Sequence, residues 1–531
     1  MLWIKHPIRI SIIKKKIMRL LSLIMILEKT FSICPECYKF GKIKKIDAEI
    51  IQDDTRVWMI KDCKKHGSFK EIYCNDVHVY KKWMRFKVTG RNNPDVNTKL
   101  FDGQELYSEH KSQSVLTHLL ITNRCNLRCD YCFMNAGASG YVYEPSLTQI
   151  KKLLLRARGK NPIETKAIQI TGGEPTIRED LFEIIRMAKE IGFTHVQVHT
   201  NGIQLAESIE YCQCLKNEQV NTIYLSFDGV TKKTNPWINQ CKKAINNLRK
   251  VNLKVVLVPV IRGDKNLKDA GKIVRFALEN MDIIRGVNFQ PISFCGRANI
   301  MTDAQREAQR VDHVDILVEI EKEFNGRISR GDFYPASLAF PFSQLIDSVK
   351  WHGQFEFSAH PGCGVVTYLF YEDGKPLPIT RFMDVEGLIA FIEKQSDIKG
   401  PLKKIRRGAS FIKHAFDYVD KEKLPTGLNL KRLLTGLAIW RNYDSLTRLQ
   451  SKSLFIGTMW FQDSFNLDVE RLKRCIIHCT IPEGIIPFCT YTGLGFGEKI
   501  REKHSIPLKE WEKLVGRSQD EDLWKGDISN K

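Results

Sequence analysis

The sequence predicts an α/β protein whose central part is a partial (β/α)6 barrel. Between residues 115 and 300, six strand-like segments alternate with amphipathic helices, as in a parallel sheet covered by helices. Two cysteine-bearing turns flank short strands between residues 31 and 90, and further cysteines recur through residues 301–531. These observations predict a small metal-binding module before the barrel and a cysteine-rich extension after it.

Composition and charge limit the function classes. The 531 residues are 43% hydrophobic and 27% charged, which argues against a disordered chain or a polytopic membrane protein. The formal net charge of +21 favours acidic partners, namely phospholipid headgroups, nucleic acid or phosphorylated substrates. Fifteen cysteines in a long chain without a cleavable signal indicate metal or redox chemistry in a reducing compartment, so we expect a cytoplasmic protein.

Residues 1–30 form a basic amphipathic segment. Lys5, Arg9 and residues 14–16 interrupt its apolar residues before they could span a bilayer. We expect an interfacial helix that contacts anionic headgroups, which would place the protein peripherally on the inner face of the cell membrane. The alternatives are a helix docked against the body of the protein, or a true start at Met18 or Met25.

Residues 31–90 contain the predicted rubredoxin-like metal module. Cys34 and Cys37 share a C-P-x-C turn that directs both thiols to one point, and Cys63 lies in a second turn. The fourth ligand is either His66, which follows Cys63 closely, or Cys74, which would complete a four-thiolate site. Both sets suit one tetrahedral iron or zinc ion. Residues 91–114 are predicted to be a linker over the surface.

The barrel is predicted over residues 115–300. Residues 179–191 and 267–278 carry apolar side chains at helical spacing. Functional residues of α/β barrels lie at the carboxyl ends of the strands, so polar residues that directly follow a strand are the candidate site. The predicted strands are residues 115–122, 167–171, 195–200, 222–227, 254–261 and 286–290.

Three cysteines, Cys125, Cys129 and Cys132, follow the first strand. A [4Fe-4S] cluster normally takes four thiolates, so a C-x3-C-x2-C loop without a fourth cysteine nearby leaves one iron open. A structural zinc knuckle is the alternative, although such knuckles usually pair two C-x2-C turns. The spacing, with Tyr131 before the last cysteine, resembles the signature of the radical S-adenosylmethionine (SAM) enzymes. The resemblance implies that SAM binds the open iron and is cleaved to a 5'-deoxyadenosyl radical.

The residues after the next three strands match that resemblance. Gly172-Gly-Glu-Pro-Thr176 resembles the G-G-E-P loop of the same enzymes. Its glycines would let the backbone approach a ligand closely, and its carboxylate suits the ammonium group of SAM. The candidate SAM contacts are Tyr131, Gly172, Gly173, Glu174, Asn201, Ser226 and Asp228.

The remaining cysteines predict auxiliary clusters by their number. With four cysteines in the metal module and three on the SAM loop, eight remain, which would hold two [4Fe-4S] clusters and bring the total to three. This count favours Cys74 over His66 in the module. The alternative is that some of the eight are small buried hydrophobic residues, above all the first three. The eight are Cys212, Cys214, Cys241, Cys295, Cys363, Cys475, Cys479 and Cys489.

Several motifs in combination resemble the archaeal tetraether lipid synthases: C-P-E-C, C-N-L-R-C-D-Y-C-F, G-G-E-P-T, N-F-Q-P, H-P-G-C-G and I-P-F-C-T-Y. The resemblance implies an enzyme that joins terminal methyl carbons of the isoprenoid chains of archaeal diether phospholipids, giving macrocyclic or tetraether lipids. It implies SAM as cofactor, and an archaeal diether phospholipid, the membrane surface and a low-potential electron donor as partners. No nucleic acid partner is expected.

Three other functions remain open. A peptide-modifying radical SAM maturase typically has C-x2-C pairs in its extension, and none occurs here after Cys132. An RNA-modifying radical SAM enzyme would suit the positive charge, but no RNA-binding appendage is recognisable. A membrane-surface iron-sulfur electron carrier has no need of an open iron.

Overall fold

The computed structural model describes most of the chain. The described residues are 25–39, 41–99, 105–159, 163–300, 302–349, 356–395, 403–426, 428 and 452–526. The expected N-terminal helix of residues 1–30 lies outside them except for residues 25–30, which belong to a strand and not to a helix. Over the part of the chain described, no helix combines the length and the apolar character needed to cross a membrane.

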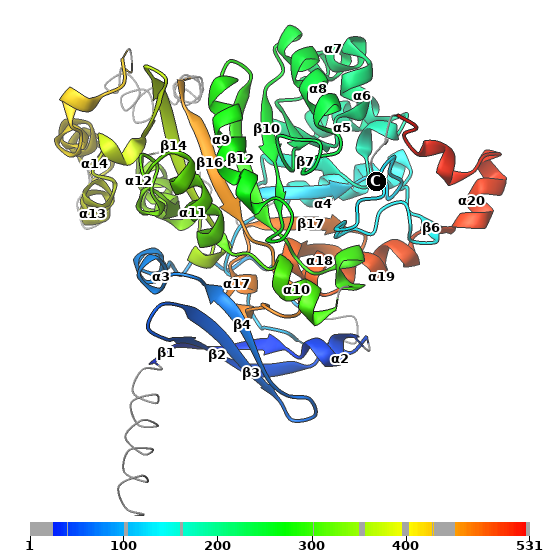
Figure 1. Ribbon diagram of the computed structural model, residues 1–531, viewed down its shortest axis with the longest axis horizontal. Coiled ribbons are helices and arrows are strands. Elements are labelled where there is room, and N and C mark those ends of the chain that lie inside the picture. The colour runs from blue at the N-terminus through cyan, green and yellow to red at the C-terminus, as the bar shows by residue number, and fades with distance from the viewer. Residues whose placement is uncertain are drawn as a thin grey trace, which may run out of the picture.

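A large, mostly parallel sheet forms the centre of the molecule (Figure 1). Its six central strands coincide with the six predicted ones, and each pairs in parallel with the next along the chain. Most of their side chains are buried, because a sheet covered by helices hides both of its faces. The strands are β5 (Leu116–Leu120), β7 (Ala167–Thr171), β8 (His195–Thr200), β9 (Thr222–Ser226), β10 (Val255–Val258) and β12 (Ile284–Pro291).

Amphipathic helices connect these strands. The predicted helices over residues 179–191 and 267–278 are confirmed as α5 (Leu181–Ile191) and α9 (Ala270–Glu279). Their apolar faces belong to the same hydrophobic core as the strands. The other elements of this region are β6 (Tyr141–Val142), α4 (Leu147–Arg158), α6 (Ile203–Glu207), α7 (Ile209–Asn217), α8 (Ile238–Lys250) and β11 (Val260–Ile261).

The C-terminal part extends this sheet at both edges. Strand β16 (Leu454–Met459) pairs in parallel with β12, and β14 (Gly364–Glu372) continues that edge. At the other edge β17 (Ile477–Ile481) pairs in parallel with β5, followed by β18 (Gly484–Pro487). The predicted domain boundary implies that the sheet ends at residue 300. The pairings show instead that the same sheet continues with strands from beyond that residue.

The remaining elements surround this sheet. Helices α12 to α14 form a small apolar cluster of their own, separate from the main core. The bounds are α10 (Asp303–Gln309), α11 (His313–Glu323), β13 (Tyr334–Pro335), α12 (Phe340–Val349), β15 (Lys375–Pro378), α13 (Val385–Gln395), α14 (Lys403–His414), α17 (Val469–Lys473), α18 (Phe488–Gly493), α19 (Phe496–Lys503), β19 (Ile506–Pro507) and α20 (Leu508–Val515).

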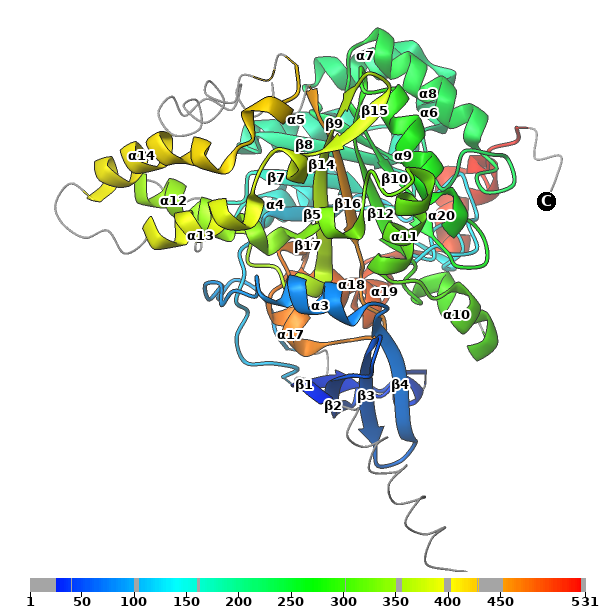
Figure 2. The ribbon, with the colours of Figure 1, turned by 60° about the vertical axis from the view of Figure 1, so that its left-hand side comes forward.

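The N-terminal module is a four-stranded antiparallel sheet that lies below the barrel in both views (Figures 1 and 2). Buried hydrogen bonds attach it to the body: Asp468 accepts from Thr30 at 2.7 Å and from Tyr73 at 2.6 Å. The module comprises β1 (Met25–Ile33), α2 (Pro35–Lys39), β2 (Lys45–Gln52), β3 (Val57–Cys63) and β4 (Gly67–Cys74), with α3 (Val77–Met84) after it.

The segment between module and barrel is not the surface linker that the sequence predicts. Leu106, Tyr107, His110 and Ser112 are all buried, and the backbone N–H of Asn93 donates to the His110 carbonyl. The described residues of this segment are part of the folded body.

Candidate metal and cofactor sites

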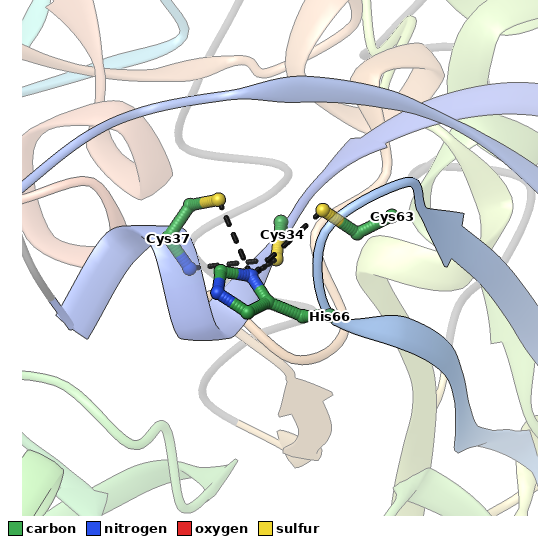
Figure 3. A group of neighbouring side chains, drawn as sticks. All are labelled: Cys34, Cys37, Cys63 and His66. Carbon is green, nitrogen blue, oxygen red and sulfur yellow. Dashed lines mark hydrogen bonds between the residues drawn. The ribbon is translucent and has the colours of Figure 1, made fainter.

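Three cysteines and one histidine meet at one end of the N-terminal module (Figure 3). The Sγ atoms of Cys34, Cys37 and Cys63 lie 3.3, 3.5 and 3.8 Å from Nδ1 of His66. In a tetrahedral zinc site with ordinary bond lengths, ligand atoms are about 3.6 Å apart. The four side chains therefore have the spacing of a closed tetrahedral metal site.

Backbone N–H groups near this site stabilise a thiolate, the form in which a cysteine binds a metal cation. N–H groups of Lys65 and His66 point at the Cys63 sulfur and lower the pKa of this thiol to about 6. Burial instead raises the pKa of Cys34 to about 11. Metal binding requires deprotonated thiols, and these N–H groups favour the deprotonated form of Cys63.

Cys74 does not take part in this site, contrary to the preference derived from the cysteine count. Cys74 is the last residue of strand β4, which begins directly after His66. The eight extended residues of this strand place Cys74 about 23 Å from the start of the strand, and so far from His66. Its Sγ contacts the carbonyl of Asp76 at 3.4 Å, and it packs in the main core. The alternative fourth ligand, His66, occupies the position.

The loop after β5 places the three cysteines of the C-x3-C-x2-C motif around one cavity. Cys125, Cys129 and Cys132 line a cavity at the carboxyl ends of the barrel strands. Burial raises the pKa of Cys125, and it raises that of Cys129 to about 12, so cluster binding must displace protons. All seven candidate SAM contacts line the same cavity. The arrangement suits a three-thiolate cluster with a ligand at its open iron.

Glu174 is fixed by the chain itself and keeps room for one more donor. Its Oε1 accepts hydrogen bonds from the Thr176 N–H and hydroxyl and from the Thr200 hydroxyl, at 2.6–3.1 Å. Its Oε2 accepts from the Asn201 N–H at 2.8 Å and has a second lone pair left. Burial raises the pKa of this carboxyl. A cationic donor in the cavity, such as the SAM ammonium group, would donate a hydrogen bond to this remaining lone pair of Glu174.

The two glycines of the motif have a different role from the expected one. A Cβ on Gly172 would lie 2.3 Å from the Thr122 carbonyl oxygen, and one on Gly173 would lie 2.0 Å from that of Arg124. The N–H groups of Gly173 and Glu174 donate to these same carbonyls. The glycines therefore let the residues after β7 pack against the cysteine loop. The sequence analysis expected them instead to let the backbone approach a ligand closely.

Further contacts attach the cysteine loop to neighbouring strand ends. The Tyr131 hydroxyl donates to Asp228, whose other oxygen accepts from the Val260 N–H at 2.8 Å. The amide of Asn201 donates to the Asn126 side chain at 2.7 Å. Tyr131, Asn201 and Asp228 thus hold the loop as well as line the cavity.

The C-terminal residues cover this loop. The Trp524 N–H donates to the Asn126 carbonyl at 3.1 Å, and the Trp524 ring lies edge-on to Trp237, a cavity residue, at 5.6 Å. Asp522 forms a buried ion pair with Arg124 at 2.9 Å. The end of the described chain shields one side of the cavity from water.

Five of the eight remaining cysteines gather behind the barrel mouth. Burial raises the pKa of Cys475, and the nearby Cys489 and Cys363 raise it further. Burial likewise raises the pKa of Cys479, with Cys475 and Cys489 close enough to add to the shift. Burial raises the pKa of Cys295, and the nearby Cys489 and Cys132 raise it further. These five residues, Cys295, Cys363, Cys475, Cys479 and Cys489, form the C-terminal cysteine group.

Buried cations beside this group support a negatively charged cofactor. Arg471 is 2% exposed and donates to the Trp460 carbonyl at 2.6 Å. Within the described residues, its Nε and two nitrogens of Arg474 are buried without a hydrogen-bond partner. Thiolate-ligated clusters accept such hydrogen bonds at their sulfurs. Four of the five cysteines could therefore hold one auxiliary [4Fe-4S] cluster.

The other three cysteines do not join them, so the predicted ligand set of a second auxiliary cluster is wrong. Cys212 and Cys214 are two apart on α7, one buried and the other exposed, and residues at this spacing do not face each other. Cys241 lies on α8 and contacts the Ser226 carbonyl at 3.4 Å. Cys212 and Cys241 are buried, as the alternative in the sequence analysis expected for cysteines that act as small hydrophobic residues.

The sequence analysis missed polar residues inside the barrel. His118, Gln169, His199 and Gln290 line a second, small cavity. It continues the first, because Phe133, Met134, Thr171, His199 and Gln290 line both. A signal was present: in strands buried on both faces, side chains are usually apolar throughout, and these strands carry polar residues at alternate positions.

Comparisons with known proteins agree with this geometry. The Radical SAM superfamily profile matches residues 119–277, and that of the HMPTM N-terminal zinc ribbon domain matches residues 26–75. The 7,8-dihydro-6-hydroxymethylpterin dimethyltransferase of Methanocaldococcus jannaschii is 39% identical over 506 residues, covering 92% of this chain and 97% of the relative.

Other similar proteins cover smaller parts of the chain. A probable GTP 3',8-cyclase of Sulfolobus acidocaldarius is 29% identical over 178 residues, with 33% of this chain and 56% of the relative covered. The structure of Escherichia coli coproporphyrinogen III oxidase, a radical SAM enzyme, aligns over 40% of this chain and 53% of its own with a TM-score of 0.29 and 11% identity.

The comparisons confirm the expected superfamily but not the narrower expectation of a tetraether lipid synthase, since the relative that matches almost end to end is named as a pterin dimethyltransferase. The chain belongs to the radical SAM superfamily, with an N-terminal zinc ribbon, in the family of the Methanocaldococcus jannaschii 7,8-dihydro-6-hydroxymethylpterin dimethyltransferase.

Proposed function

We propose that this protein is a radical SAM enzyme that methylates carbon on a reduced hydroxymethylpterin. The observation that carries the proposal is the 39% identity to the pterin dimethyltransferase over nearly the whole of both chains. The geometry supports the chemistry, because three thiols and all seven candidate SAM contacts line one cavity.

Residues of this chain would hold the cofactors and exclude water. Cys125, Cys129 and Cys132 would ligate the cluster, and the free lone pair on Glu174 Oε2 would orient the SAM ammonium group. When bound, SAM and its cluster supply a carbon-centred oxidant able to remove hydrogen from an unactivated C–H bond. Trp237 and Trp524 would protect that reactive site from solvent.

The net reaction balances without an external oxidant. Each methylation replaces a substrate hydrogen by a methyl group from a sulfonium donor, for which we propose SAM itself. One SAM molecule supplies the radical that takes the replaced hydrogen, which leaves in 5'-deoxyadenosine together with methionine. A second sulfonium gives the methyl group and becomes a thioether. Two electrons from a low-potential donor partner balance the charge of the two sulfonium groups.

The same proposal includes one auxiliary [4Fe-4S] cluster at the C-terminal cysteine group and one zinc or iron ion in the N-terminal module. Two clusters in total need eight irons, whereas the cysteine count alone suggested three clusters. The supporting observation is the C-terminal cysteine group of five buried or half-buried cysteines, two of which, Cys363 and Cys489, lie near Arg471.

A second candidate is the coupling of isoprenoid chains of a diether phospholipid at the membrane surface. The apolar wall shared by the two cavities favours it, because Phe133 and Met134 line both, and Leu120, Phe461 and Phe488 continue the second. Joining two C–H carbons removes two hydrogens, which two SAM molecules and two donor electrons would account for.

One anaerobic assay separates the candidates. Reconstituted enzyme is incubated with SAM, dithionite and either 6-hydroxymethyl-7,8-dihydropterin or archaeol phospholipid, and products are measured by mass spectrometry. The proposal expects a pterin heavier by one or two methylene masses. A lipid lighter by two hydrogens, with two 5'-deoxyadenosine molecules per bond and an unchanged pterin, would replace it by the second candidate.

A further inference from the structure

Two buried arginines of this protein have no carboxylate partner. Arg124, Arg178, Arg471 and Arg501 are the least exposed arginines of the described chain, at 2–6% of their surface. Arg124 and Arg178 each form an ion pair with a carboxylate. Within the described residues, Arg471 and Arg501 form none. A buried charge without a partner costs several kcal/mol, so we expect a negatively charged group beside these two guanidinium groups.

Both of these arginines lie against the C-terminal cysteine group. Cys363 and Cys489 are close enough to Arg471 to favour its charged form. On another side of the group, burial raises the pKa of Cys479, and Arg501 is close enough to oppose this shift. The two guanidinium groups without carboxylates therefore face different cysteines of the same group.

Arg501 is held in place with one donor left over. Its Nη1 donates to the Tyr491 hydroxyl at 2.9 Å, and its Nη2 donates to the Met134 carbonyl at 3.1 Å. Both partners belong to the same hydrophobic cluster as Cys479 and Cys489. The Nε of Arg501 is buried and has no hydrogen-bond partner among the residues that the structure describes. Helix α19 thus holds a charge and an unpaired N–H beside the cysteines.

An uncharged donor without a partner lies near Arg471 as well. The Gly362 N–H donates to Nδ1 of His360 at 3.1 Å, which leaves the proton of this ring on Nε2. That Nε2 is buried and unpaired within the described part of the chain. Burial, together with the charges of Lys87, Arg471 and Arg474, holds the pKa of His360 well below its ordinary value, so the ring is neutral.

One [4Fe-4S] cluster would balance the two arginines. In its usual oxidised state the cluster core has two positive charges, so four thiolate ligands leave the whole group with two negative charges. Arg471 and Arg501 supply two positive charges. Reduction by one electron adds a further negative charge, which nearby cations stabilise. Buried arginines should therefore raise the reduction potential of such a cluster.

We propose that Arg501 is a counterion of the auxiliary cluster on the side of Cys479, and that it raises the reduction potential of this cluster together with Arg471 on the side of Cys363. This inference rests on the auxiliary cluster that the proposed function includes. It adds a residue outside the cysteine set that controls how readily the cluster takes up an electron.

A redox titration of the reconstituted full chain, followed by electron paramagnetic resonance, tests the inference. The auxiliary signal is the one that added SAM does not change. Arg501→Gln keeps a side-chain N–H but removes the charge, so the ratio of reduced to oxidised auxiliary cluster at a fixed potential should fall about tenfold. Arg501→Lys keeps the charge and should stay close to the parent. Arg178→Gln, at a buried arginine with its own carboxylate, is the matched control and should not change the ratio.

Every outcome bears on the counterion role. The parent's ratio in Arg501→Gln at equal iron content would overturn it, and so would equal shifts in the glutamine and lysine variants. Loss of about four irons from the glutamine variant alone would support it, whereas loss from both would overturn it.

The same experiment separates this inference from the proposed function. A parent protein with only a SAM-sensitive cluster would overturn the inference, while methylated pterin in the mass spectrum would still support the proposed function. The expected shift in Arg501→Gln, without any methylated pterin from the parent, would support the counterion and count against the methylation chemistry.

Discussion

Replacing Arg310 by methionine tests the buried ion network that joins the N-terminal module to the barrel. The guanidinium binds Asp463 through two hydrogen bonds of 2.8 and 3.1 Å, and its Nε donates to Glu71 on β4 at 2.9 Å. The side chains of Arg310 and Asp463 are 4% and 0% exposed. Removing one partner of such a pair leaves a buried charge, so we expect a loss of about 3–5 kcal/mol in the free energy of unfolding.

The loss should depend on pH. Burial opposes ionisation of Asp463, but Arg310 and backbone N–H groups outweigh it and hold the pKa of this carboxyl below its ordinary value. A carboxyl with a lowered folded-state pKa stabilises the protein above its unfolded pKa, and that contribution disappears as the pH falls through the folded pKa. The loss in free energy of unfolding caused by Arg310→Met should therefore be largest at neutral pH and should become smaller below about pH 4.

Urea unfolding followed by tryptophan fluorescence, at equal metal and iron content, measures the effect. Arg186→Met is the matched control, because its pair with Glu218 is exposed and should contribute less than about 1 kcal/mol. Equal unfolding midpoints for the Arg310 and Arg186 variants at neutral pH would refute the argument that this network stabilises the fold.

Three further predictions concern the sites. Gly173→Ala should abolish SAM binding and lower the iron content by about four atoms, because the new Cβ would meet a backbone carbonyl of the cysteine loop; parent-like iron and SAM binding would contradict this. His66→Ala should lose the bound zinc or iron by elemental analysis, whereas Cys74→Ala should retain it. Cys489→Ser should remove about four irons and Cys214→Ser none, and an equal loss in both would contradict the cysteine grouping.

The six barrel strands could be predicted because their signal is local. Each is a short apolar run between helices with a regular apolar face, and the structure places all six within a few residues of the predicted bounds. The edge strands could not, because β16 and β17 pair with partners far away in the sequence and no local pattern encodes such pairing. This is why the barrel sheet continues beyond residue 300.

The grouping of cysteines was predictable where spacing determines geometry. C-P-x-C and C-x3-C-x2-C turns hold their thiols close in space, and the structure groups both as expected. Counting was a poorer guide, because it treats every cysteine as a ligand. It favoured Cys74 over His66 and enlisted Cys212 and Cys241, which are buried in the main core.

The pairing of β17 with β5 has a consequence for biosynthesis. The first barrel strand leaves the ribosome about 360 residues before the strand that flanks it, which is a delay of roughly 20–70 seconds at ordinary rates of synthesis. Trp524 and Asp522, which cover the cysteine loop, emerge later still. Until Asp522 and Trp524 have been synthesised, the ion pair with Arg124 and the hydrogen bond to Asn126 cannot form, so that this cover over the cysteine loop forms late.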